Sequence, residues 1–176
     1  MARSSSEHAE LPPRTVTTSE VTDLWQTVTR SGGAVGFPVD TPAELIAEAA
    51  AHALHEVESG HEHLLTEREG NALLGMVLLR RQKGPVHRHR AEVRKLMVRP
   101  ERQRTGTGGR LLARAVEHAR QLGLRQLLLA TRGGTHLPDC YRRQGWTEVG
   151  RFPAALHVAP GDFRDEHWFQ YDLVTR

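Results

Sequence analysis

The chain has 176 residues, a formal net charge of +3 at pH 7, 38% hydrophobic residues and one cysteine. This length suits one domain with its own buried core, and a single cysteine excludes an internal disulfide. No apolar run approaches the roughly 20 residues that a membrane helix needs, and the polar N-terminus does not resemble a signal peptide, so we expect a cytoplasmic protein without membrane partners.

The charges are unevenly distributed along the chain. Acidic residues predominate in residues 1–75, whereas basic residues strongly predominate in residues 76–132. A basic region of this kind fits a polyanionic cofactor or a nucleic acid. The basic stretch contains no aromatic residue on which single-stranded bases would stack, so the sequence favours a cofactor and predicts no nucleic-acid partner.

The N-terminal part predicts a tail, a short strand and a helix. Residues 1–13 are polar and end in two prolines, which predicts a flexible tail ahead of a single domain over 14–176. Residues 14–18 are predicted as a short strand. Ser19 is the predicted N-cap of a helix whose apolar stripe ends before Gly32.

A second helix is predicted from a stronger start signal. Thr41 and Glu44 have the spacing of a capping box, and Pro42 lies at the position that proline favours at a helix start. The apolar stripe that follows continues to Gly60. Two helices therefore precede most of the predicted sheet.

The middle of the chain predicts a hairpin followed by a βαβ unit. Strands are predicted over residues 61–67 and 71–81, with a short turn between them. A strand over 91–98, a helix over 109–122 and a strand over 126–131 come next. Strand, helix and strand in this order predict two parallel neighbours in one sheet.

The last part predicts a short helix and two paired strands. The helix runs from about residue 137 to a stop at Gly145, and residues 146–152 and 167–173 are predicted as an antiparallel pair joined by a long connection. The predicted fold class is α/β, with a mixed twisted sheet, a central βαβ unit and helices on both faces.

The stretch from Leu96 to Leu112 joins a strand end, a basic turn and a glycine-rich helix start. A helix start presents unpaired N–H groups and a positive dipole end, and glycines let a phosphate approach the backbone closely. The glycines are Gly106, Gly108 and Gly109, and the surrounding arginines are Arg99, Arg102, Arg104 and Arg110. The pattern predicts a phosphate site; the alternative is a solvated basic turn.

This loop is not one of the two common nucleotide motifs. A Walker loop needs a lysine after its last glycine, and a dinucleotide fingerprint needs a glycine where Leu111 stands. The segment Gln103-Arg104-Thr105-Gly106-Thr107-Gly108 instead resembles the acetyl-CoA pyrophosphate loop, Gln/Arg-x-x-Gly-x-Gly/Ala, of the GNAT superfamily of N-acyltransferases. Tyr141 to Trp146 is similar to the Tyr-x-x-x-Gly-Phe/Trp element of that family, and the order of elements over residues 61–173 is similar to its fold.

The resemblance implies acetyl-CoA as co-substrate, with no metal, and a set of cofactor contacts. On this model, main-chain groups of Leu96, Met97 and Val98 pair with the pantetheine arm in a gap between two splayed strands. The pyrophosphate contacts implied by the motif are the backbone N–H groups of Gln103, Arg104, Thr105, Gly106, Thr107, Gly108 and Gly109. Many members carry an asparagine where this chain has Gly134, so one expected cofactor hydrogen bond is missing.

Two side chains are predicted to be catalytic. Tyr141 matches the family position whose phenol faces the thioester sulfur, which implies a general acid; the alternative is a ring that only packs in the core. Glu92 is the predicted general base, because strand alternation places it with Arg94, Leu96 and Val98 on one face. A water chain or a histidine remains an alternative base, and the N–H of Met97 or Val98 is the predicted oxyanion donor.

The acceptor is less determined than the cofactor. Residues 91–98 and the Gly145 to Pro153 spacing resemble the tabtoxin-resistance branch of the family, which implies a small-molecule amine or an amino-acid-like toxin as acceptor rather than a protein. We expect the acceptor surface to come from the first two helices, residues 32–40 and residues 153–166. Asp40, Glu44 and Asp162 are candidate partners for a cationic amine, and each has an alternative role as a solvated surface charge.

The predicted function is therefore transfer of an acetyl group from acetyl-CoA to a primary amine by direct attack in a ternary complex. No obvious base flanks Cys140, which argues against a covalent acetyl carrier. The arginines beside His87 and His89 argue against a metal site there. The alternatives are a non-catalytic acyl-CoA-binding regulatory module and a basic nucleic-acid-binding protein; the sequence leaves a homodimer open.

Overall fold

The computed structural model describes residues 15–174. The helices are α1 (Thr18–Arg30), α2 (Ala43–Glu58), the 3-10 turn η1 (Pro100–Arg102), α3 (Thr107–Gln121) and α4 (Leu137–Arg143). The strands are β1 (Glu62–Glu69), β2 (Ala72–Arg81), β3 (Arg90–Val98), β4 (Gln126–Arg132), β5 (Thr147–Ala159) and β6 (Asp162–Asp172). The predicted tail over residues 1–13 lies outside the described residues.

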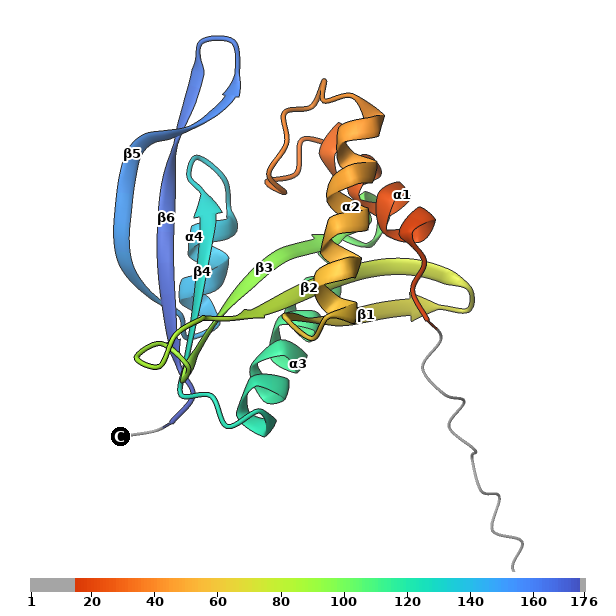
Figure 1. The fold of residues 1–176 in the computed structure, drawn as a ribbon. Helices are drawn as coiled ribbons and strands as arrows, with labels where there is room; N and C mark the ends of the chain where they lie inside the picture. The colour runs from red at the N-terminus through yellow and green to blue at the C-terminus, as the bar shows by residue number, and fades with distance from the viewer. Residues whose placement is uncertain (1–14, 175–176) are drawn as a thin grey trace, which may run out of the picture.

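The six strands form one mixed sheet in the order β1-β2-β3-β4-β6-β5. Only β3 and β4 are parallel neighbours, and α3 connects them, so the predicted βαβ unit is confirmed. The other neighbouring strands are antiparallel. Figure 1 shows β4, β5 and β6 turning away from β1, β2 and β3, so that the sheet opens into two parts.

Helices cover both faces of the sheet, as predicted. Helices α1 and α2 pack on one face, where Leu24, Ile46 and Met76 belong to a common buried cluster. Helices α3 and α4 pack on the other face, where Leu112 and Phe169 belong to a second cluster. We refer to these as the α1/α2 face and the α3/α4 face.

The start of α1 differs from the prediction. Residues 15–17 have no regular structure, so the predicted short strand is absent from the described part of residues 14–18. The N-cap is Thr17 rather than Ser19: its hydroxyl accepts from the N–H of Glu20, whose carboxylate accepts from the Thr17 N–H. Of these two residues, only Thr17 has a glutamate three residues later, and this spacing is what a reciprocal capping box requires.

The second helix starts one residue later than predicted, at Ala43, and without its capping box. The Thr41 hydroxyl donates to the carbonyl of Pro38 at 2.8 Å, and the cap residue of α2 is Pro42. The apolar stripe also contains one exception, because Leu45 is 49% exposed. The helix therefore depends on the packing of its buried face, which includes Ile46 and Ala50, more than on its cap.

The last two strands are longer than predicted. Residues 153–166 were expected to form a connection, but β5 and β6 continue through most of them as one hairpin that turns at Gly161. The pairing contains three register shifts, one of them beside Ala154, which has a positive φ of 52°. The hairpin extends beyond the rest of the sheet beside β4 (Figure 1).

Candidate active site

The glycine-rich loop follows the end of β3 and leads directly into α3. Gly106 is the N-cap residue, adopts a left-handed conformation with φ of 85° and supplies no side-chain cap. The N–H of Arg110 donates to the carbonyl of Gly106 at 3.0 Å and makes the first hydrogen bond of the helix. The N–H groups of the first turn are thus left for a ligand or solvent.

Two of the glycines are not required by the protein's own conformation. A Cβ on Gly109 would meet no atom within 4 Å, and one on Gly108 would lie 3.6 Å from Val98, an ordinary contact. Neither residue has a positive φ. Absence of side chains here therefore gives no packing benefit, but it leaves the helix start open to close approach by an anion.

The side chains of the loop hold its shape. Gln103 Nε2 donates to the carbonyl of Val98 at 3.1 Å, and the Thr105 hydroxyl donates to the carbonyl of Arg102 at 2.7 Å. The hydroxyls of Thr105 and Thr107 are 3.1 Å apart. These contacts leave the backbone N–H groups as the main donors toward a ligand.

Three of the four predicted phosphate-binding arginines are paired with carboxylates of neighbouring elements. The pairs are Arg99 with Asp23, Arg102 with Glu69 and Arg110 with Glu67. Arg104 is exposed, has a positive φ of 61° and has no hydrogen-bond or ion-pair partner among residues 15–174. It is therefore the loop arginine most free to bind a phosphate group.

The sheet opens immediately beside this loop. Strands β3 and β4 are paired only from Arg90 to Glu92 of β3 and from Gln126 to Leu128 of β4. Beyond these positions, β3 remains paired with β2, and β4 remains paired with β6 to its end. The edge of β3 that faces β4 is therefore unpaired from residue 93 onward, and its N–H and C=O groups are available to an extended ligand.

A bulge in β3 overturns the predicted alternation. The register with β2 shifts between Arg94 and Met97, and Lys95 has a positive φ of 50°. Leu96 and Val98 consequently pack with the α3/α4 cluster, whereas Met97 packs with the α1/α2 cluster. Glu92 and Arg94 therefore do not share a face with Leu96 and Val98, because one extra residue inverts every later side chain.

Tyr141 lies on α4 and is buried, with 8% of its surface exposed. Its ring packs against Trp146 and Phe169, with centroid distances of 6.3 and 5.7 Å. Burial raises the pKa of the phenol to about 12. The hydroxyl makes no hydrogen bond within residues 15–174, so it is a protonated donor at neutral pH that no other part of the described structure uses.

Glu92 lies on the opposite side of the sheet from Tyr141. Its neighbours in sequence, Ala91 and Val93, belong to the α3/α4 cluster, so alternation directs Glu92 to the α1/α2 face. Burial raises the pKa of its carboxyl group above the usual value, although the charge of Arg94, whose Nε is 3.8 Å away, opposes this. A carboxylate with a raised pKa is a better base toward an amine.

The family is decided by comparison with known proteins. Residues 23–146, more than half of the chain, match the model of the acetyltransferase (GNAT) family. The chain belongs to the GNAT acetyltransferase family. The comparison with curated proteins found no match.

Solved structures share the GNAT fold over nearly the whole chain. The ribosomal-protein-alanine N-acetyltransferase of Brucella melitensis is 18% identical, with a TM-score of 0.75 and coverage of 90% of this chain and 98% of its own. The protein yncA of Salmonella typhimurium, solved with its cofactor acetyl-CoA, is 16% identical, with a TM-score of 0.72 and coverage of 93% and 94%. An aminoglycoside 6'-N-acetyltransferase complexed with coenzyme A is 16% identical, with a TM-score of 0.67 and coverage of 90% and 92%.

The GNAT fold of this chain also contains a buried charge cluster that the sequence analysis did not identify. Glu62 on β1 is 2% exposed, and its Oε1 accepts from Arg80 Nε at 2.5 Å and from Arg94 Nη1 at 2.7 Å. The three residues come from three adjacent strands. The only sequence signal is a glutamate in step with Leu64, which packs on the α1/α2 face.

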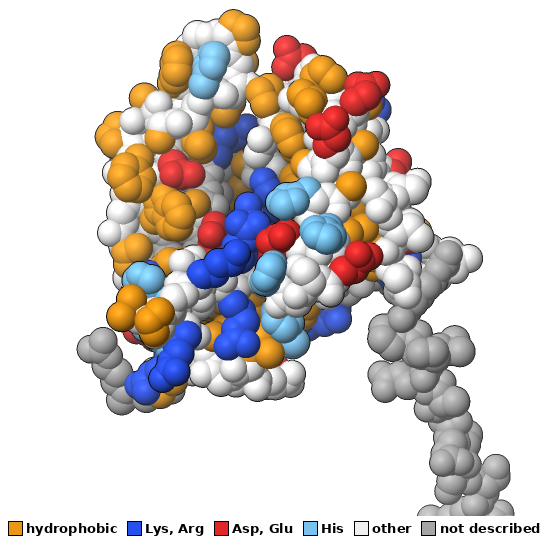
Figure 2. All heavy atoms as spheres, in the orientation of Figure 1, with side chains coloured by type: hydrophobic (Ala, Val, Ile, Leu, Met, Phe, Trp, Pro, Cys, Tyr) orange, Lys and Arg blue, Asp and Glu red, His pale blue; other side chains and the backbone are white. Residues whose placement is uncertain are grey.

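A cavity of about 190 Å³ adjoins this cluster between α2 and the sheet. Its lining includes Glu62, Arg80, Arg94 and Lys95, together with the rings of Trp25 and Phe37. Figure 2 shows Lys and Arg side chains gathered in the hollow between the β5–β6 hairpin and α2. The three acidic residues predicted as partners for a cationic amine do not line this cavity. Asp40 and Glu44 are exposed, and Asp162 is paired with Arg164 at 2.6 Å.

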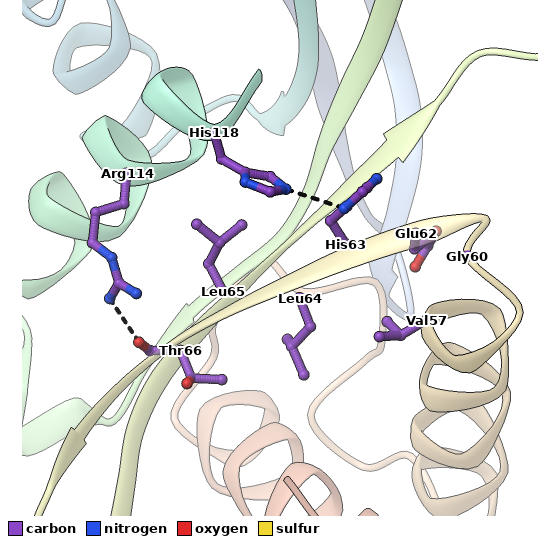
Figure 3. Close-up of a pocket in the computed structure, with 9 residues that line it drawn as sticks. All are labelled: Val57, Gly60, Glu62, His63, Leu64, Leu65, Thr66, Arg114 and His118. Carbon is purple, nitrogen blue, oxygen red and sulfur yellow. Dashed lines mark hydrogen bonds between the residues drawn. The ribbon is translucent and has the colours of Figure 1, made fainter. Parts of the chain in front are cut away.

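A second cavity of about 410 Å³ lies along β1, at the edge of the sheet. Figure 3 shows His118 and Arg114 extending from α3 toward this strand. His118 Nε2 lies 3.1 Å from His63 Nδ1, and Arg114 donates to the carbonyl of Thr66 at 2.7 Å. Desolvation and the nearby His118 lower the pKa of His63. These contacts attach α3 to the sheet edge, away from the opening between β3 and β4.

Two further findings concern metals and membranes. Within residues 15–174, no three His, Cys, Asp or Glu side chains are grouped so as to hold a metal ion. None of the helices in the same range has the length and apolar character needed to cross a bilayer.

Proposed function

We propose that this GNAT acetyltransferase transfers the acetyl group of acetyl-CoA to a primary amine of a small molecule, by direct attack in a ternary complex. The observation that carries the proposal is the adjacency of an uncapped helix start and an unpaired strand edge, both at the carboxyl end of β3. The first suits a pyrophosphate and the second suits an amide-containing arm.

The residues present fit the cofactor. The backbone N–H groups from Gln103 to Gly109 would hold the pyrophosphate, and Arg104 is free to neutralise a further phosphate. Main-chain groups of Leu96, Met97 and Val98 would pair with the pantetheine arm along the open edge of β3. Gly134 supplies no side chain for the cofactor contact that asparagine makes in many members.

The two predicted catalytic residues lie on opposite faces, which suits direct transfer. Acetyl-CoA supplies an activated thioester. Glu92, from the α1/α2 face, would take the proton that the amine loses as its nitrogen bonds to the carbonyl carbon. Tyr141, from the α3/α4 face, would donate a proton to the sulfur as the carbon–sulfur bond breaks, and solvent would return one to the phenol. The N–H of Met97 or Val98 would stabilise the negative charge that develops on the carbonyl oxygen.

Direct transfer needs no acetylated enzyme. Cys140 is half-buried, and its sulfur accepts a hydrogen bond from Gln144 Nε2 at 3.1 Å. A cysteine nucleophile depends on an adjacent base, and residues 15–174 place no histidine in hydrogen-bond contact with this sulfur. The proposal therefore excludes a covalent step through Cys140. The cytoplasmic location and the homodimer stay predictions.

Calorimetric titration at physiological salt tests the cofactor part of the proposal. We expect acetyl-CoA and CoA to bind with micromolar affinity and a short DNA duplex to bind weakly or not at all. An amine panel with detection of released CoA thiol then tests turnover. Binding of acetyl-CoA without turnover of any amine would favour a non-catalytic regulatory module. Binding of the duplex alone would favour a nucleic-acid-binding protein.

A further inference from the structure

The cavity between α2 and the sheet lies on the same face as Glu92. Arg94 borders this cavity and also lies 3.8 Å from the Glu92 carboxylate, so one side chain connects the two places. Glu92 and Arg94 precede the bulge of β3 and are two residues apart, which keeps them on one face. A small ligand bound beside Arg94 would therefore lie next to the proposed base.

The charges around the cavity do not cancel. Three cationic side chains, Arg80, Arg94 and Lys95, share its lining with one carboxylate, that of Glu62. A single oxygen of Glu62 accepts from both arginines, one N–H group from each. Within residues 15–174, the remaining N–H groups of these arginines have no hydrogen-bond acceptor, apart from the longer ion pair between Arg94 and Glu92.

Lys95 adds a cation that no carboxylate neutralises directly. Its Nζ donates to the carbonyl of Val35 at 3.1 Å and lies 5.1 Å from the centre of the Trp25 ring. A Cβ on Gly36 would lie 2.5 Å from this Nζ, so the glycine makes room for the ammonium group. Because burial in the cavity wall disfavours an uncompensated charge, an anionic ligand would be stabilised here.

We infer that the acceptor of this enzyme is an amine that also carries a carboxylate, as an amino acid does, and that Arg80 and Arg94 bind this carboxylate. The inference rests on the proposed function and extends it to a substrate class. Guanidinium groups suit a carboxylate because their planar N–H donors match its two oxygens. The rings of Trp25 and Phe37 form the apolar part of the lining and would contact the rest of a small molecule. The same charges repel polycationic amines.

A paired substrate panel tests the inference. Each amino acid is compared with its own carboxamide, and a polyamine is included; released CoA thiol is measured at saturating acetyl-CoA. We expect at least one acid to be acetylated with a kcat/KM about 10- to 100-fold above that of its amide, because charge-assisted hydrogen bonds are lost in the amide. Amides or the polyamine reacting as well as the acids would overturn the inference.

Variants of the cavity residues test whether the cavity causes the preference for acids over amides. The double variant Glu62→Gln with Arg80→Gln removes one charge of each sign, so no buried carboxylate is left without its partner. We expect it to reduce the acid-to-amide ratio about tenfold, which corresponds to one charged hydrogen bond, mainly through KM. Glu62→Gln alone keeps both arginines and removes the carboxylate that they contact, so the ratio should stay the same or rise, whereas the exposed control Arg120→Gln on α3 should leave it unchanged. An unchanged ratio in the double variant would contradict the assignment.

Acetyl-CoA affinity separates this inference from the proposed function. It is measured for every variant by calorimetry and should be the same in all of them, since the cavity lies on the α1/α2 face. If acetyl-CoA binds but no acid is acetylated, the substrate class is wrong while the cofactor site stands. If acetyl-CoA does not bind, the proposed function fails and the inference fails with it.

Discussion

The α3/α4 face and the α1/α2 face contribute to the candidate active site in different ways. On the first, the groups proposed to bind ligand are backbone N–H and C=O groups at the start of α3 and along β3. On the second, they are charged side chains that meet from different strands, such as Glu62 and Arg94. Backbone groups do not titrate. Binding of acetyl-CoA on the α3/α4 face should therefore depend less on pH than binding of the acceptor on the α1/α2 face.

The largest effect is expected where the backbone itself binds. Gly108→Asp adds a side chain and a negative charge at the helix start, where an anion is proposed to bind, so acetyl-CoA affinity should fall by roughly a hundredfold or more. Calorimetry measures the affinity, and thermal unfolding should show a folded protein. Gly108→Ala adds the Cβ without the charge and keeps the fold, since that Cβ makes only an ordinary contact with Val98, so it should lose less affinity than the aspartate variant. Unaltered affinity in the aspartate variant would place the phosphates elsewhere.

Removal of the Tyr141 hydroxyl should affect chemistry and not binding. Tyr141→Phe keeps the packing with Trp146 and Phe169, and it breaks no hydrogen bond among the described residues. We expect kcat to fall by about 10²- to 10⁴-fold, with the KM for acetyl-CoA unchanged. Steady-state kinetics at saturating acetyl-CoA measure this. A kcat equal to that of the parent would show that the ring is only part of the core.

Replacement of Glu92 should lower the activity but not the stability of the protein. Because burial raises its pKa, the charged carboxylate lowers the stability of the folded state at neutral pH, and Glu92→Gln should unfold at the same or a higher temperature. The same variant should lose about 10- to 100-fold in kcat/KM and lose the acidic limb of the pH profile. Full activity with an unchanged profile would assign the base to another group.

The smallest effect concerns the stability of the α1/α2 face in acid. The bond from Arg68, followed by that from the Thr17 N–H, lowers the pKa of Glu20 from 4.5 to about 2. This carboxylate therefore contributes stability above pH 4.5 that is lost as the pH falls toward 2, on the order of 1–2 kcal/mol after solvent screening. Chemical denaturation across this range should show the loss in the parent protein. In Glu20→Gln the slope should be smaller, and an equal slope would contradict the assignment.

Local sequence signals were sufficient for most of the elements. Apolar periodicity identified α1, α2 and α3, and the continuous apolar run over residues 127–130 identified β4, in which buried and half-buried residues alternate. The loop from Gln103 to Gly109 was recognisable because its proposed function depends on consecutive residues: a turn, glycines and a helix start. Its geometry therefore follows from the order of the residues, and the structure moved the first helical residue from 109 to Thr107.

The features that the sequence analysis missed depend on residues far apart in the chain. The bulge at Lys95 is fixed by the register between β2 and β3, and it moved Leu96 and Val98 to the other face. The hairpin of β5 and β6 extended through a predicted connection because each strand supplies the other's hydrogen bonds. The cavity between α2 and the sheet could not be predicted, because Glu62, Arg80 and Arg94 become neighbours only when three strands pair.

The sequence by itself determined the family, most of the order of the elements and the proposed cofactor loop, since these depend on contacts within a few residues. Only the tertiary structure decided which face each side chain of β3 occupies, which arginines remain unpaired and where the buried charges meet. The physical reason is that a strand's register is set by its partner strand, and a shift of one residue reverses the direction of every side chain that follows.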